Sequence, residues 1–328
     1  MTEVIRSENT ADDIEWKEFL RNQYNLFFDE KFYSYNNVFG KGISFHNLKF
    51  RDGLTGKINA IMMGCEREVN GERQFISCDG VSFAGFLWKK RSDLLNFFDA
   101  IRGFKTYLGD KGFAKAVLRT PPFVYNKAPN QETEYALLKS GFEVTSVSIS
   151  NIIDLEEFEF KNISETKKRS IKKSQKDISV NIIDDVLTVD NFKEYYEILL
   201  DNRELKNVSP THSMDELIYL KNKLPESIIL FEARIGSRLA AICVLFSISK
   251  DIILNFYLAG SEEFKLQGAA ELILLKSIEW SKENGYRYYD IGTSDTSEGL
   301  IEGLFAFKKK FLAHGFLRKT YEVKLTKN

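Results

Sequence analysis

A glycine late in the chain stands where a helix has to begin. Lys265, Gly268 and Ala270 form a K-x-x-G-x-A sequence immediately before an apolar run at residues 271–278. A helix that starts at Gly268 leaves free backbone N–H groups and the positive end of its dipole in the preceding loop, where small side chains let a pyrophosphate approach. The pattern therefore predicts an anion cradle. Tight helix packing around small residues is the alternative explanation, and this short pattern leaves it open.

A basic run at residues 167–176 is a second candidate for anion binding. Lys168, Lys172 and Lys176 fall on one face of a predicted helix at residues 166–176, with two further cations beside them. Their mutual repulsion would be relieved by an anionic ligand, such as a nucleotide-sugar diphosphate, a phosphorylated acceptor or tRNA. A solvated helix face explains the same run, and the residues alone do not decide between the two.

Asp290 is a candidate for proton transfer. It lies at the carboxyl end of a predicted strand at residues 286–291, where open α/β sheets place functional groups. It is a candidate base or acceptor-orienting group, and capping of the following loop at residues 292–298 is the equal alternative. The sequence has no P-loop, no G-x-S-x-G elbow and no His/Glu pair at zinc-ligand spacing, so no metal is expected.

The elements that position these residues are a run of strands and one helical crossover. Strand-like runs at residues 227–233, 239–249 and 252–258 are separated by turns too short for a parallel return. They therefore form an antiparallel meander. Residues 260–285 are long enough to carry a helix and a parallel return, so the sheet changes to parallel pairing at this crossover.

This order of residues resembles the GNAT N-acetyltransferase superfamily, in which a Q/R-x-x-G-x-G/A loop at this place binds the pyrophosphate of acyl-CoA. Lys265 replaces the usual Gln or Arg. The resemblance implies acetyl-CoA or another acyl-CoA as cosubstrate, with the thioester carbonyl in a wedge between the strands at 252–258 and 286–291. Backbone N–H groups there would be the oxyanion donors. The implied cofactor-binding residues are Leu258, Gly260, Lys265, Gln267, Gly268, Ala269 and Ala270.

The same resemblance implies roles around the acceptor. In GNAT-like folds the loop between the first two helices faces the acceptor, which makes Arg203, Thr211 and His212 candidates for acceptor contact. An amine with a pKa of about 10.4 must lose a proton before it attacks, and His212 and Asp290 are the candidate bases. Tyr257 is the nearest candidate for protonating the departing thiolate. Capping of the next helix is the alternative role for Thr211.

A second resemblance covers more of the chain. The basic run, Tyr289-Asp290-Ile291-Gly292 and Phe307-Lys308-Lys309-Lys310-Phe311 resemble, in this order, the FemAB/FemX-like branch of the superfamily, most strongly over residues 162–315. That branch has two GNAT-like domains and includes aminoacyl-tRNA-dependent peptidyltransferases and acyl-CoA-dependent relatives. It implies a transferase in which Lys308 contacts the acceptor or its phosphates. Lys172 is a further substrate-binding candidate, and the acyl donor stays open.

The two halves of the chain repeat one plan, which indicates a duplication. In each half a helix ends in Gly-Phe before a strand. We expect an α/β (α+β) fold of two tandem GNAT-like domains, residues 1–155 and 156–328, each a mixed, mostly antiparallel sheet flanked by helices. The approach to the long helix of the first domain carries Trp88 and no counterpart of Gly268, so only the second domain is expected to hold acyl-CoA. The alternative is that any two α/β halves look alike at this level.

Composition limits the remaining possibilities. The 328 residues carry a net charge of −1, which gives no global attraction to nucleic acid or an anionic membrane. No apolar run approaches membrane-spanning length and the N-terminus lacks the apolar core of a signal peptide. We therefore expect a cytoplasmic protein, monomeric or homodimeric, without membrane insertion. Cys65, Cys78 and Cys243 have no C-x-x-C spacing and are expected to be inert thiols.

Three functions remain on this basis. The preferred one is an acyl-CoA-dependent N-acyltransferase, in particular an N-acetyltransferase, in which a small amine acceptor such as an amino sugar or cell-envelope precursor attacks the thioester directly. The first alternative is an aminoacyl-tRNA-dependent, FemX-like peptidyltransferase with tRNA as partner, which the basic run favours. The second is a non-catalytic binding protein on the duplicated scaffold, since no residue is an unambiguous base.

Overall fold

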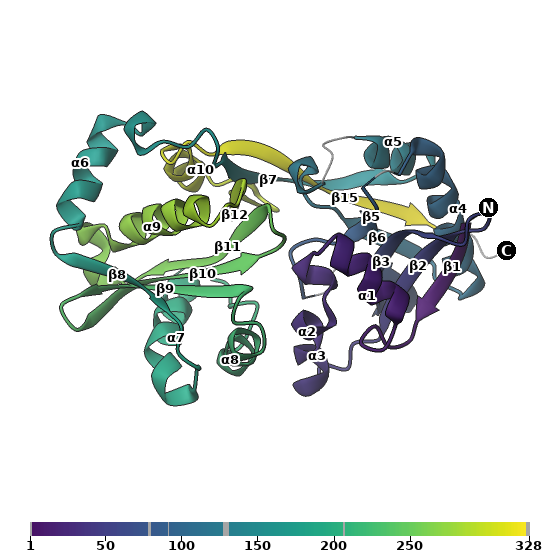
Figure 1. Cartoon of the computed structure of the whole chain (residues 1–328), viewed down its shortest axis with the longest axis horizontal. Coiled ribbons are helices and arrows are strands. Elements are labelled where there is room, and N and C mark those ends of the chain that lie inside the picture. Colours follow the sequence, from purple (N-terminus) through teal and green to yellow (C-terminus); the bar gives the residue numbers. More distant parts are fainter. Residues whose placement is uncertain (1, 78–79, 91, 127–130, 206, 326–328) are drawn as a thin grey trace. The chain divides into compact units, whose positions relative to one another are not determined.

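The chain folds into two compact units (Figure 1). The computed structural model describes residues 2–77, 80–90, 92–126, 131–205 and 207–325. Unit 1 comprises Met1–Ser148 and Phe316–Asn328, and unit 2 comprises Ile149–Gly315. The boundary between residues 148 and 149 lies seven residues before the expected one, which was between residues 155 and 156. The C-terminal strand differs more, because it returns to unit 1 instead of completing the second domain.

Unit 1 is a mixed sheet in the strand order β1-β2-β3-β4-β6-β15, with β5 paired to the first part of β3. The β4–β6 pair is parallel, and the pairs β1–β2, β2–β3, β3–β4 and β6–β15 are antiparallel. Its strands are β1 (Thr2–Ser7), β2 (Phe45–Asp52), β3 (Ile58–Val69), β4 (Glu72–Ile76), β5 (Gly85–Trp88), β6 (Lys115–Arg119) and β15 (His314–Lys324). Its helices are α1 (Ile14–Asn22), α2 (Glu30–Tyr33), α3 (Tyr35–Val38), α4 (Leu94–Asp110) and α5 (Glu132–Lys139), with 3-10 turns η1 (Leu26–Phe28) and η2 (Phe123–Tyr125).

The long helix α4 closes the core of unit 1. Asp93 precedes it and accepts a hydrogen bond from the N–H of Asn96, whose side chain accepts from the N–H of Asp93 in return. This capping box fixes the start of the helix. Phe97 and Phe104 are buried in one cluster with the sheet, and Trp88 packs against it. The N-terminus of α4 is thus capped by a carboxylate of its own.

The strands of unit 2 also form mixed pairings, in the order β7-β12-β11-β10-β9-β8. Strands β8 to β11 pair antiparallel in sequence order, whereas β11 and β12 pair in parallel, so the expected meander and parallel crossover are confirmed. Its strands are β7 (Glu143–Asp154, which begins in unit 1), β8 (Ile178–Ile183), β9 (Ile228–Ile235), β10 (Arg238–Ser247), β11 (Ile252–Gly260), β12 (Tyr288–Thr293), and the short pair β13 (Asp295–Thr296) and β14 (Gly299–Leu300). Its helices are α6 (Glu165–Ser174), α7 (Val189–Glu204), α8 (Met214–Lys223), α9 (Ala269–Glu283) and α10 (Glu302–Lys309), with 3-10 turns η3 (Phe160–Asn162) and η4 (Glu262–Gln267).

Helices cover both faces of the unit 2 sheet. The crossover helix α9 lies on one face, and α7 and α8 lie on the other (Figure 1). Ile273 and Ile278 of α9 belong to one buried cluster with Ile253 of β11. On the opposite face, Ser213 and Glu216 form a capping box that starts α8. The two helix starts that border the candidate site are therefore built differently, since α8 has a side-chain cap and α9 begins after a glycine.

Candidate functional site

Strands β11 and β12 part halfway along their length. Their ladder ends at the pair Leu254 and Asp290, although β11 continues to Gly260 and β12 to Thr293. At the same point the pairing of β11 with β10 skips Phe256, as in a β-bulge. Among the described residues no ladder pair joins this edge of β11 to β12 beyond Leu254, so the ladder leaves alternate backbone N–H groups of the edge unused. We call this divergence of the two strands the fork.

The N-terminus of α9 lies against the end of β11. Gly268 precedes the helix with a φ of +76°, and no side chain caps the terminus. A Cβ built at Gly260 would lie 3.3 Å from the Cβ of Ala270, so small residues on both elements permit the close approach. Leu258 and Ala269 pack into the core below. The first N–H groups of α9, with the positive end of its dipole, therefore lie beside the unpaired part of β11.

The other side of Gly268 packs against α6. Ser174, the last residue of α6, donates a hydrogen bond to the carbonyl of Gln267 at 2.7 Å. A Cβ built at Gly268 would lie 2.7 Å from the Ser174 hydroxyl oxygen. Glycine is therefore required here for two reasons, the close contact with Ser174 and the left-handed backbone. Both explanations of the K-x-x-G-x-A sequence thus have support, namely close packing on one side of the glycine and an uncapped helix terminus on the other.

Acidic residues surround this terminus closely. The turn η4 carries Glu262 and Glu263, and Lys265 pairs with Glu262 at 3.0 Å. Lys167 of α6 is buried and pairs with Glu271 in the first turn of α9. The lysine of the K-x-x-G-x-A sequence is therefore already engaged by a carboxylate. An anion at this loop would have to be favoured by other cations as well as by the helix dipole.

The exposed face of α6 supplies such cations. Arg169, Lys172 and Lys173 of α6 are exposed, as is Lys176 just after the helix. Within the part of the chain that the structure describes, no carboxylate forms an ion pair with any of them. Ser174 of the same helix touches the loop before α9, so the helix that carries these cations packs against that loop. The basic run is therefore placed where it can attract phosphates, although its exposure also fits a solvated face.

The loop between α7 and α8 places His212 against Tyr257. His212 is fully buried; its backbone N–H donates to the Tyr257 hydroxyl at 3.1 Å, and its Nδ1 lies 3.0 Å from the same oxygen. The rings of Phe246 and Phe256 flank the imidazole, and Thr211 beside it is exposed. Burial raises the pKa of Tyr257 to about 12, against the opposing effect of its hydrogen bonds. The phenol therefore stays protonated at neutral pH, as a proton donor must be.

Arg203, in the last turn of α7, extends the same cluster. Its guanidinium carbon lies 5.4 Å from the centre of the Tyr257 ring. Its buried Nε has no hydrogen-bond partner in the described part of the chain, and burial lowers the pKa of the group. By contrast, Arg234 forms ion pairs with Glu232 and Glu194. The acceptor contacts that the resemblance implies, Arg203, Thr211 and His212, therefore lie near Tyr257, the candidate acid on β11.

Asp290 and Lys308 are both buried and bind the backbone of one turn. Asp290 Oδ1 accepts hydrogen bonds from the Ser150 hydroxyl and from the Gly292 N–H, each at 2.7 Å. Lys308, from α10, donates to the carbonyls of Gly292 and Thr293 at 2.9 and 2.6 Å. For Asp290 this is the loop-capping role that the sequence left as an alternative. For Lys308 it differs from the implied acceptor contact, because a lysine at this depth needs acceptors for its donors within the protein.

A buried polar network behind the fork was missed from the sequence. The Tyr289 hydroxyl lies 2.6 Å from Ser277 Oγ and accepts a hydrogen bond from Asn255 Nδ2 at 2.9 Å. Cys243 Sγ is 4.0 Å from the same oxygen, and burial raises the pKa of its thiol to about 12, as suits an inert cysteine. Cys78 lies outside the described residues. The available signal was Asn255 itself, a polar residue within an otherwise apolar strand.

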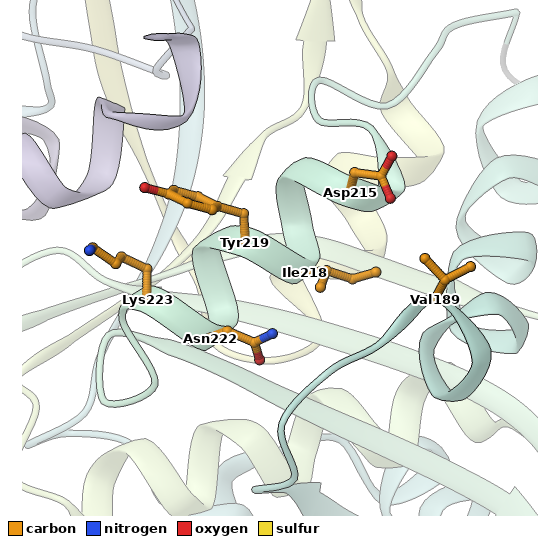
Figure 2. A pocket seen from close by; sticks show the side chains of 6 residues that line it. All are labelled: Val189, Asp215, Ile218, Tyr219, Asn222 and Lys223. Atoms are coloured by element: carbon orange, nitrogen blue, oxygen red, sulfur yellow. The ribbon is translucent and has the colours of Figure 1, made fainter. Parts of the chain in front are cut away.

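A shallow pocket of about 450 Å³ lies apart from these groups, between the start of α7 and α8 (Figure 2). Ile218 points from α8 toward Val189 at the start of α7. The remaining lining residues are Asp215, Tyr219, Asn222 and Lys223, none of which was a candidate from the sequence. Among the described residues, no group of His, Cys, Asp and Glu side chains is arranged to hold a metal ion. No helix in that part of the chain has the length and apolar character needed to cross a bilayer.

Comparison with known proteins identifies the fold. No family profile matches the sequence, and no curated protein matches it. FemX superimposes with a TM-score of 0.71 over 98% of this chain and 97% of FemX, at 12% identity. L-PGS from Bacillus licheniformis gives 0.61 over 95% and 92%, at 12% identity. A tandem GNAT protein from the clavulanic acid biosynthesis pathway gives 0.56 over 99% and 98%, at 10% identity. At these identities the likeness establishes the tandem GNAT fold alone.

Proposed function

We propose that this protein is an acyltransferase that moves an acyl group from acyl-CoA, with acetyl-CoA as the preferred donor, to a small amine such as an amino sugar or cell-envelope precursor. The observation that carries the proposal is the end of the β11–β12 ladder at Leu254 and Asp290, beside the uncapped N-terminus of α9. On a tandem GNAT fold, this combination favours a thioester at the fork and its pyrophosphate at the helix terminus.

The residues around the fork fit such a donor in their backbone and in their charge. The N–H groups of Gly268, Ala269 and Ala270 would hold the pyrophosphate, and those near Leu258 and Gly260 would face the thioester carbonyl. The exposed cations of α6 add a positive field close to the terminus. Glu262 and Glu263 of η4 oppose this positive field. Because a phosphate there needs cations to offset these carboxylates, we include the basic run in the proposed site.

Tyr257 is the proposed acid for the departing thiolate, because it carries a proton at neutral pH and lies on β11 beyond the end of its ladder with β12. We propose that His212 holds the Tyr257 hydroxyl through its backbone N–H and its Nδ1. For His212 or Asp290 to serve as the base, the amine would have to reach a fully buried side chain. Arg203 and Thr211 stand at the partly open side of this cluster and are the proposed acceptor contacts.

Unit 1 is proposed to lack a donor site. The corresponding helix α4 begins with Asp93, whose carboxylate accepts from the N–H of Asn96 in the first turn. A carboxylate on the helix terminus already binds one of the N–H groups that a phosphate would use, and it repels a second anion. The contrast between Asp93 before α4 and Gly268 before α9 supports a single donor site in unit 2.

Calorimetry with acetyl-CoA tests the donor site. Gln267→Glu places a negative charge in the exposed loop before α9 without changing its backbone. A unit charge near a phosphate in a solvent-exposed setting costs about 1 kcal/mol, so binding should weaken about fivefold. Gln131→Glu, at the exposed residue before α5 in unit 1, is the matched control and should leave the affinity unchanged. Equal affinities in both variants, or no acetyl-CoA binding by the wild type, would contradict the donor assignment.

An aminoacyl-tRNA donor is the second candidate, and the exposed basic face of α6 is the observation that favours it. Charged tRNA should then bind with strong salt dependence, and Lys172→Gln together with Lys173→Gln should reduce the slope by about 0.7–0.9 per lost phosphate contact. Lys193→Gln, which removes the charge of an exposed side chain on α7, serves as the control. Binding of charged tRNA without binding of acetyl-CoA would select this donor. Ligand binding without turnover of any acyl donor would select a non-catalytic binding protein.

A further inference from the structure

The backbone of β12 alternates in direction up to the end of its ladder. The N–H of Tyr288 donates to the carbonyl of Asp251, which leads into β11. Arg287, the residue before β12, shares the Asp251 carbonyl through its N–H, and its own carbonyl accepts from the N–H of Leu155, which follows β7, so the regular alternation begins at Tyr288. Because the N–H and C=O of one residue point to the same side and the side alternates along a strand, every second residue after Tyr288 would face β11. Gly292 therefore carries the next N–H and C=O of β12 that a continued ladder would join to β11.

Buried side chains bind both of these groups of Gly292 instead. Its N–H donates to Asp290 Oδ1 at 2.7 Å, and its C=O accepts from Lys308 Nζ at 2.9 Å. Asp290 is fully buried and Lys308 is 4% exposed, so both interactions are shielded from water. Gly292 has a φ of +82°, and the register of β12 with β7 also breaks between Asp290 and Thr293. The strand thus leaves the ladder where these two side chains meet its backbone.

We propose that Asp290 and Lys308 are positioning residues that keep the fork open by occupying the N–H and C=O with which β12 would otherwise extend its ladder along β11. Hydrogen bonds to a charged partner are stronger than the neutral ladder bonds that they replace, so the competition favours the open fork. The alternate N–H groups of β11 between residues 255 and 260 that face away from β10 then stay outside the ladder and available to a ligand. The role of the fork in catalysis rests on the proposed function, whereas its opening by these side chains does not.

Hydrogen–deuterium exchange on the full-length, ligand-free protein tests this role at the amides of residues 255–260. Lys308→Met removes the donors to both carbonyls while keeping an unbranched side chain. The ladder should then extend, exchange at 255–260 should slow at least fivefold, and acetyl-CoA binding should weaken. Lys310→Met, at an exposed lysine two residues on, should change neither. Unchanged or faster exchange at 255–260 in folded Lys308→Met would overturn the proposal.

Gly292→Ala gives a second perturbation in case Lys308→Met does not fold. An alanine disfavours the φ of +82° and so favours an extended backbone, while its Cβ would make only ordinary contact, 4.0 Å from the Asn255 carbonyl oxygen. Gly285→Ala is the matched control, since Gly285 has a φ of +81° and open space around an added Cβ. Slower exchange at 255–260 in Gly292→Ala alone supports the proposal, and equal exchange in both variants refutes it. Acetyl-CoA binding by the wild type is measured separately, so its absence would contradict only the proposed donor.

Discussion

Replacement of Tyr289 by phenylalanine probes the buried network behind the fork. The change removes one hydroxyl from a fully buried ring and leaves the ring in place. Ser277 keeps a partner, because its hydroxyl also donates to the carbonyl of Leu274 at 2.8 Å. Asn255 Nδ2 loses the acceptor that it has at 2.9 Å. A buried donor left without its partner costs about 1–3 kcal/mol and the lost serine bond about 1 kcal/mol more, so the free energy of unfolding should fall by about 2–4 kcal/mol.

Urea denaturation followed by circular dichroism measures this loss. Tyr288→Phe makes the same chemical change on the neighbouring, partly exposed residue and should cost less than about 0.5 kcal/mol. If the hydroxyls act as one network, Tyr289→Phe combined with Ser277→Ala should cost less than the sum of the single variants. A loss in Tyr289→Phe no larger than that in Tyr288→Phe would refute the reasoning, because it would mean that Asn255 finds another acceptor at no cost.

Two further predictions concern the cluster around Tyr257. The pKa of Tyr257 is raised to about 12 by burial, so its contribution to stability is complete below the ordinary value near pH 10 and is lost as the pH rises toward 12. Tyr257→Phe should therefore flatten the fall in unfolding free energy between pH 10 and 12, measured in urea, and should lower kcat by about 10–100-fold with unchanged affinity for acetyl-CoA. Arg203→Met should raise the KM for the acceptor and cost less than about 1 kcal/mol of stability. Arg234→Met, which leaves the carboxylates of Glu232 and Glu194 without their cation, should cost more in the same urea titration.

Local signals in the sequence are enough to predict how strands β9 to β12 of unit 2 pair. The short turns between β9, β10 and β11 allow only antiparallel returns, and the glycine-led helix α9 supplies the parallel crossover, as the strand pairing confirms. Ser213 and Glu216 stand three residues apart, and their capping box fixes the start of α8. These features depend on neighbours in the sequence, which is why a single sequence is enough to predict them.

Side-chain roles that depend on distant residues were harder to predict. Asp290 is held by Ser150, which lies 140 positions earlier, and Lys308 reaches the carbonyl of Gly292 from another helix. Strand β1 was not expected either, because its short sequence becomes a strand only through pairing with β2. Burial and pairing of this kind are properties of the assembled sheet, so the charge and spacing of a motif such as Phe-Lys do not reveal which way its lysine points.

The place of β15 in unit 1 has a consequence for how the protein is made. Residues 149–315 precede this strand, yet its Tyr321 and Val323 pair with Leu118 and Ala116 of β6. During synthesis β6 therefore keeps an unpaired edge until β15 has been made, whereas unit 2, which lies between the two strands in the sequence, is made before β15. Such an edge is a template for aggregation while it waits. Deletion of β15 should thus destabilise unit 1 more than unit 2, although unit 2 stands next to β15 in the sequence.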